Sequence, residues 1–323
     1  MQGMTWRSAF RLAGIALSVA CLVYFTVSAA HALDSAGTHL GLRTILVGIA
    51  TALPPYAVGY ALFALVWHLL LKGLGTRVDP ATTFGIFFVS QFGKYLPGNV
   101  AHHAGRVLLS KRFGYALTPV GAAMALETLV TVAAAAVLSI PLAASLGALL
   151  GRLAAPGTIL AAVLAALIVV SCVVWILIRR GALRHLAARL GPIASSLRLS
   201  NAVPLLMKSL LLAVSAIILC AGSLGILGAG SVMELQSSYF HVVALFSVAW
   251  IAGLLTPGAP AGLGVREVIL MEGLSSHFGP AGATAAAIMF RLLTVTADLL
   301  ALAVGTVLLR AASNRDRNAT RSS

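Results

Sequence analysis

Residues 91–106 read QFGKYLPGNVAHHAGR, and residues 254–267 read LLTPGAPAGLGVRE. In both segments an apolar stretch ends at a Pro-Gly pair, and an arginine follows nine residues after the proline. Proline removes a backbone donor and glycine allows unusual φ angles, so we expect a helix break at Pro97 and Gly98, and another at Pro257 and Gly258. Broken helices that carry charge inside an apolar chain are typical of binding sites in membrane transporters.

The composition is that of an integral membrane protein. Of the 323 residues, 60% are hydrophobic and only 9% are charged, whereas a soluble domain carries about 25% charged residues. Several apolar stretches reach the roughly 20 residues that a helix needs to cross a bilayer. The formal charge of +14 comes from Lys and Arg that mostly flank these stretches, which indicates orientation and contact with anionic lipid. We therefore expect membrane lipids, and no nucleic acid, as partners.

The order of apolar and polar segments predicts a single all-α, polytopic membrane domain over residues 1–323. We expect about six full transmembrane helices and two re-entrant helical hairpins, the first at 82–112 and the second at 239–278. The full spans are expected at 12–30, 45–71, 119–146, 157–178, 202–227 and 281–309. Two complete crossings per hairpin would fit the charge pattern equally well.

Lys and Arg cluster in the segments that connect the predicted spans on one side. They lie in residues 1–11, 72–77, 179–198 and 310–321, which places these segments and both termini in the cytoplasm. In this topology the first hairpin enters from the cytoplasm and the second from outside. That opposite entry is what an inverted repeat produces, with halves at about 45–147 and 203–309.

Three further segments are interpreted from their composition. Residues 12–30 are expected to form a retained first helix, with a cleaved signal peptide as the alternative. Residues 179–200 place four leucines and Ile193 at three- or four-residue spacing among five arginines. This pattern fits a cytoplasmic amphipathic helix on the membrane surface, and an ordinary basic loop fits it equally well. The tail at about 311–323 is basic and polar and is expected to be disordered.

Seven charged side chains lie in or beside segments predicted at membrane depth. One charge at the bilayer centre costs about 2.5–3.5 kcal/mol, so these side chains need partners or a water-filled cavity. One interpretation is structural pairing, for example of Arg106 with Glu127 and of Glu267 with Arg291. The other is a cavity that receives a lipid headgroup, for which an anionic phosphate suits the basic excess. The predicted headgroup-binding residues are Lys94, Arg106, Glu127, Arg266, Glu267 and Arg291; Asp298 is the seventh charge.

Other motifs do not indicate catalysis. The adjacent His102 and His103 cannot face one site on a helix, and no nearby carboxylate or cysteine completes a set of ligands. We therefore expect no metal site. Residues 262–264 read GLG but lack the further glycines and the strand of a nucleotide-binding loop. No Ser/His/Asp arrangement can be defended from spacing, so we expect neither a catalytic residue nor a cofactor.

Several short motifs occur in a fixed order along the chain: GKYLPG at 93–98, Arg106, Glu127, Pro257-Gly258, GLGVRE at 262–267, and Arg291. Together they resemble the lysylphosphatidylglycerol synthase transmembrane-region family, also called the flippase-like domain family, over about residues 10–310. The resemblance implies a multi-pass protein of the bacterial plasma membrane. In the best-understood relatives this region moves an aminoacylated phospholipid to the outer leaflet. Other relatives are linked to hopanoid or polyprenyl-lipid pathways.

From this resemblance we expect a lipid translocase that moves an anionic or modified phospholipid, or an isoprenoid-type lipid, between leaflets. The alternative is a membrane-embedded transferase or an accessory subunit in glycolipid or isoprenoid-lipid synthesis. The residues after Arg310 are too few for a soluble aminoacyl-transferase domain. We therefore expect that a separate lipid-synthesising enzyme, as a partner, makes the lipid.

Overall fold

The computed structural model describes residues 41–95, 101–150, 199–229, 232–256 and 260–321, together with a few positions between 23 and 31. These ranges contain seven α-helices and two short 3-10 helices, and no strand occurs in them. The all-α prediction is therefore confirmed. The α-helices are α2 (Leu42–Gly73), α3 (Pro80–Gln91), α4 (Ala101–Arg112), α5 (Leu117–Leu150), α8 (Leu199–Gly228), α9 (Val232–Leu255) and α10 (Val265–Arg321), and the 3-10 helices are η1 (Phe92–Tyr95) and η2 (Pro260–Gly262).

Five of the described helical segments are long and apolar enough to cross a membrane: Leu42–Gly73, Leu117–Leu142, Ala202–Gly228, Ser238–Leu255 and Pro260–Arg315. The chain is thus a multi-pass membrane protein. The predicted spans at 157–178 and, for the most part, 12–30 lie outside the described residues, as does nearly all of the predicted amphipathic segment at 179–200. The predicted helix breaks at Pro97, Gly98, Pro257 and Gly258 also lie outside them.

The first predicted hairpin consists of α3, η1 and α4. Asp79 begins it by capping α3, because its carboxylate accepts hydrogen bonds from the Thr82 backbone N–H at 2.9 Å and hydroxyl at 2.8 Å. Helices α3 and α4 have 12 residues each and pack against one another. A helix of that length extends about 18 Å, which is shorter than the roughly 30 Å of a bilayer core. This length favours the re-entrant interpretation, which stays a prediction.

The second predicted hairpin consists of α9, η2 and the first part of α10. Helix α9 has 24 residues and extends about 36 Å, enough to cross the bilayer by itself. Helix α10 bends at Gly279, whose φ of 69° and ψ of 165° are open to glycine alone. The bend separates the segment that returns from the hairpin from the last long span.

The C-terminal tail differs from its prediction. The sequence predicts disorder at about 311–323, whereas α10 continues as a helix to Arg321. Two features of this segment go beyond what its composition indicates. Ala312 is only 5% exposed, and the Arg315 guanidinium lies 3.6 Å from the Asp79 carboxylate at the start of α3.

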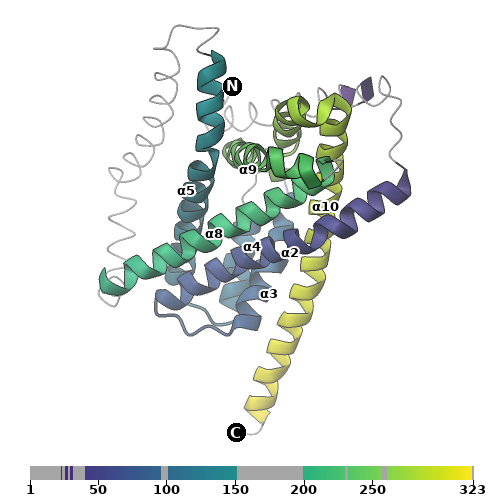
Figure 1. The fold of residues 1–323 in the computed structure, drawn as a ribbon. Coiled ribbons are helices and arrows are strands. Elements are labelled where there is room, and N and C mark those ends of the chain that lie inside the picture. Colours follow the sequence, from purple (N-terminus) through teal and green to yellow (C-terminus); the bar gives the residue numbers. More distant parts are fainter. Residues whose placement is uncertain are drawn as a thin grey trace, which may run out of the picture.

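The helices of the two predicted repeat halves pack in an exchanged arrangement (Figure 1). Helix α2 lies along α8, while α3 packs against α10 and α5 packs against α9. At the α3–α10 contact, a Cβ on Gly85 would lie 3.1 Å from the Gly305 carbonyl oxygen, so the two backbones approach closely. Small residues permit such close approach between membrane helices. This exchange is what a two-fold repeat would produce; the repeat itself stays a prediction.

Candidate functional site

A cavity of about 180 Å³ lies between the two predicted hairpins. The first hairpin contributes Lys94 and Arg106 to its lining, the second contributes Arg266, and Glu127 completes it from α5. Four of the six predicted headgroup-binding residues therefore share one cavity. The other two, Glu267 and Arg291, line a smaller neighbouring space of about 30 Å³, which Arg266 also borders.

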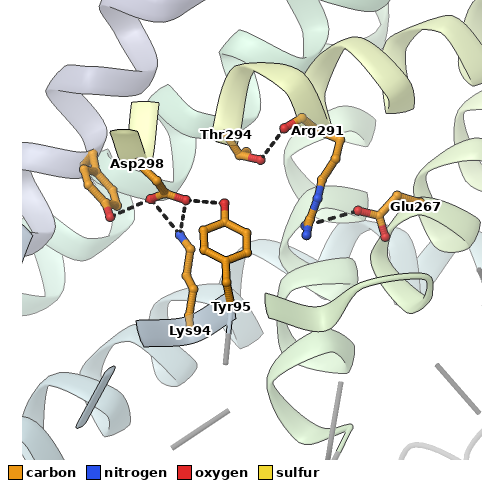
Figure 2. A network of polar contacts seen from close by, with 7 residues as sticks. Lys94, Tyr95, Glu267, Arg291, Thr294 and Asp298 are labelled. Carbon is orange, nitrogen blue, oxygen red and sulfur yellow. Dashed lines mark hydrogen bonds and ion pairs between the residues drawn. The ribbon is translucent and has the colours of Figure 1, made fainter. Parts of the chain in front are cut away.

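Asp298 is the most heavily bonded carboxylate near the cavity (Figure 2). It is 1% exposed and accepts hydrogen bonds from the Tyr60 hydroxyl at 2.8 Å, the Lys94 ammonium at 2.8 Å and the Tyr95 hydroxyl at 2.5 Å. These donors come from α2 and η1, whereas Asp298 lies on α10. One carboxylate thus joins the tip of the first hairpin to two long helices, and its charge is compensated by Lys94.

Arg106 and Glu127 form the ion pair that the sequence suggested between α4 and α5. Arg106 is 1% exposed, and its guanidinium lies 5.0 Å from the centre of the Trp67 ring and 4.5 Å from that of Phe87. Aromatic faces attract a desolvated guanidinium. The pair and its aromatic surroundings hold the second arm of the first hairpin against the helices behind it.

Arg291 and Glu267 form the other suggested pair, with 3.3 Å between nitrogen and oxygen (Figure 2). The second oxygen of Glu267 accepts a hydrogen bond from the Gly264 backbone N–H at 2.8 Å and so caps the start of α10. Arg291 also lies 5.8 Å from the centre of the Tyr95 ring. Both oxygens of Glu267 are therefore engaged, and the pair connects the two parts of α10 across its bend.

Arg266 is the exception among the charged residues. In the described part of the chain its side chain has neither an ion pair nor a hydrogen bond, and its Nε is buried. The side chain passes through a slot formed by two glycines. A Cβ on Gly253 would lie 2.6 Å from Nε, and one on Gly262 would lie 3.0 Å from it. The glycines thus leave just enough room for the arginine beside the cavity.

The charges of the site can now be counted. Lys94, Arg106, Arg266 and Arg291 are positive, and Glu127, Glu267 and Asp298 are negative. Three of the cations are paired with the three carboxylates, so four minus three leaves one uncompensated positive charge, on Arg266. Structural pairing therefore accounts for three of the four cations, and the fourth lines the cavity. That a lipid headgroup enters this cavity stays a prediction.

Some residues of the site were not among the predicted binding residues. Asp298 was noted only as a charge at membrane depth, although it follows Arg291 by seven residues, which places both on one helix face. The expectation that His102 and His103 cannot face one site was wrong, because both line the cavity and their ring centres are 3.8 Å apart. The Nδ1 atoms of both are buried without a hydrogen-bond partner among the described residues. Tyrosines at 56 and 60 and Trp250 form apolar walls that carry polar groups.

No group of three or more metal-ligating side chains occurs within the described ranges. The cavity is lined by paired charges, aromatic rings, two histidines and the unpaired Arg266. Its one excess charge makes it suited to an anion.

Comparison with known proteins gives the family. The family model described as the lysylphosphatidylglycerol synthase TM region matches residues 11–302, which include both hairpins and every charged residue of the site. The chain matches no curated protein. The matched region has the helical, multi-pass architecture described above, and the family's name ties it to membrane lipids. The chain therefore belongs to the lysylphosphatidylglycerol synthase transmembrane-region family, with a function related to membrane lipids.

Proposed function

We propose that this protein moves a lipid with an anionic headgroup between the leaflets of a bacterial inner membrane. The headgroup occupies the cavity between the hairpins while the acyl chains stay in the surrounding lipid. The uncompensated Arg266 carries the proposal, since it is the one cation of the site without a carboxylate. A guanidinium binds phosphate through two parallel hydrogen bonds, which suits a phospholipid headgroup.

The energetic problem of lipid translocation is the charge of the headgroup. An isolated ion in a medium of low dielectric costs tens of kcal/mol by Born solvation. A cation that is already desolvated and held in place lowers this cost for a passing phosphate. Residues of both hairpins line the same cavity, so the proposed translocation opens it to each side in turn by moving one hairpin against the long helices.

The orientation and the partner follow from the same proposal. Both termini lie in the cytoplasm, as the distribution of Lys and Arg predicts. A lipid-synthesising enzyme in the same membrane supplies the headgroup-bearing lipid.

The test is leaflet exchange of labelled phospholipids in proteoliposomes. Wild type is compared with Arg266→Ala and with the matched control Arg112→Ala, which removes an exposed arginine at the end of α4. A hydrogen bond to a charged group contributes about 1.5–3 kcal/mol, so we expect Arg266→Ala to slow exchange roughly 10- to 150-fold. Arg112→Ala should exchange lipid at the rate of wild type.

Two results would contradict the proposal. One is exchange by folded Arg266→Ala at the wild-type rate. The other is wild-type exchange no faster than in empty liposomes for every phospholipid class. Chemical turnover of a lipid-linked donor by the purified protein would instead support the transferase alternative.

A further inference from the structure

We infer that the cavity recognises a phosphodiester headgroup with a single negative charge whose remaining part is neutral and hydroxylated, such as glycerol or a sugar. Headgroups esterified with a cationic amino acid are disfavoured. This inference rests on the proposed function only for the entry of a lipid into the cavity. It is drawn from the charged side chains and the two histidines around that cavity.

The first argument concerns the carboxylates, which are the groups that would bind an ammonium. Asp298 has three donors, and both oxygens of Glu267 are engaged. Glu127 is neutralised by Arg106. No carboxylate of the site has an uncompensated charge, so a headgroup ammonium would find no free counter-charge and would be repelled by Arg266.

The second argument concerns the number of negative charges that the site can neutralise. One guanidinium is uncompensated, which matches the single charge of a phosphodiester. A phosphomonoester would bring close to two charges and leave one of them buried without a partner. The slot between Gly253 and Gly262 holds the Arg266 side chain in place, so the position of the phosphate is set before binding.

The third argument concerns the part of the cavity that the first hairpin forms. The side chains of His102 and His103 both line it. An imidazole ring carries hydrogen-bonding nitrogens, so these side chains favour a ligand with its own donors or acceptors. Neutral hydroxyls meet this need without adding charge, and the rings of Tyr56 and Trp250 give them an apolar wall to lie against.

The cavity is also large enough for more than a single ion. Its 180 Å³ is far above the roughly 10–15 Å³ that one water molecule requires. A phosphate with a small polyol therefore fits the available space and uses both ends of the cavity.

The test measures binding directly, with short-chain lipids and purified protein in detergent. The probes are phosphatidylglycerol, its lysyl ester, and phosphatidylmethanol, which has the same charge as phosphatidylglycerol but no headgroup hydroxyls. Phosphatidylglycerol should bind at least tenfold more tightly than the other two. Water-soluble glycerophosphoglycerol should compete with it, since the headgroup and not the acyl chains is what the cavity recognises.

Variants test separately the roles of Arg266 and of the two histidines in binding. Arg266→Gln should weaken the binding of phosphatidylglycerol at least tenfold and remove the discrimination against the lysyl ester. Arg266→Lys should bind all three lipids more weakly than wild type does but in the same order of affinity. His102→Ala combined with His103→Ala should weaken phosphatidylglycerol but leave phosphatidylmethanol unchanged. Size-exclusion profiles and cooperative unfolding show which variants are folded.

Equal or tighter binding of the lysyl ester would overturn the charge argument, and equal binding of phosphatidylmethanol would overturn the hydroxyl argument. Failure of glycerophosphoglycerol to compete would overturn recognition by the headgroup. Binding in the expected order without leaflet exchange would support this inference and contradict translocation. Leaflet exchange that requires Arg266 but proceeds equally fast for every headgroup would support translocation and contradict this inference.

Discussion

Replacing Asp298 by Asn should strongly destabilise the protein. Asparagine has nearly the same shape but no charge, so the Lys94 ammonium loses its counter-ion while it stays near the same place. The side chain of Lys94 is 20% exposed and that of Asp298 is fully buried. Breaking a buried ion pair by removing one partner costs about 3–5 kcal/mol. The ratio of folded to unfolded protein should therefore fall roughly 160- to 5,000-fold.

The reverse change should cost less. In Lys94→Met the Asp298 carboxylate keeps its hydrogen bonds from Tyr60 and Tyr95, at 2.8 and 2.5 Å. Hydrogen bonds to a charged group contribute about 1.5–3 kcal/mol each, so the remaining two partly compensate the carboxylate. Asp298→Asn is costly because it leaves the Lys94 ammonium without a counter-ion. Adding Lys94→Met to that variant should therefore recover stability.

The assay is reversible unfolding in mixed micelles of increasing denaturing detergent, followed by tryptophan fluorescence, for wild type, both single variants and the double variant. Asp79→Asn is the matched control, since it removes the charge of an exposed pair whose side chains are 45% and 61% accessible. Exposed pairs contribute about 0–1 kcal/mol. A cost of Asp298→Asn below about 1 kcal/mol, or further destabilisation by Lys94→Met in that background, would refute the reasoning.

Three further predictions concern the slot, the bend and the start of α3. Gly253→Ala places a Cβ 2.6 Å from the Nε of Arg266 and should reduce leaflet exchange as strongly as removing Arg266. Gly121→Ala is the control and should have no effect, because a Cβ at that position meets open space. Gly279→Ala should lower the free energy of unfolding by about 1–3 kcal/mol, measured in the same micelles, because alanine does not tolerate this backbone conformation. At Asp79, burial raises the pKa but the hydrogen bonds from Thr82 outweigh it and hold the pKa below the ordinary 3.8. Its contribution to stability should therefore be complete above that value and be lost as the pH falls through the lower folded-state pKa, and Asp79→Asn should remove this part of the pH dependence.

Local pattern predicted much of this architecture. The long apolar stretches indicated the helices, and the confirmed family resemblance rested on short motifs around the predicted breaks. The pairs Arg106–Glu127 and Glu267–Arg291 could be suggested because their members are 21 and 24 residues apart, within neighbouring segments. The tail was predicted wrongly as far as Arg321, because composition does not show that the last helix continues to that residue.

The remaining features depend on contacts between distant segments. Asp298 and Lys94 are 204 residues apart, and no local pattern connects them. The sequence showed four basic groups against three acidic ones but could not identify Arg266 as the unpaired one, because that requires the position of every partner. In the same way, the position of His102 and His103 in the cavity depends on how the first hairpin docks, which the sequence does not show.

The separation of Lys94 and Asp298 also has a consequence for biosynthesis. At about 5–20 residues per second, a ribosome needs roughly 10–40 s to add the 204 residues between them. Glu127, the partner of Arg106, is synthesised only 21 residues after it. The second arm of the first hairpin can therefore pack against its partner during synthesis. Lys94, at the tip of the hairpin, has no counter-ion until α10 has been synthesised. A nascent chain interrupted before Asp298 would leave the Lys94 ammonium without its counter-ion.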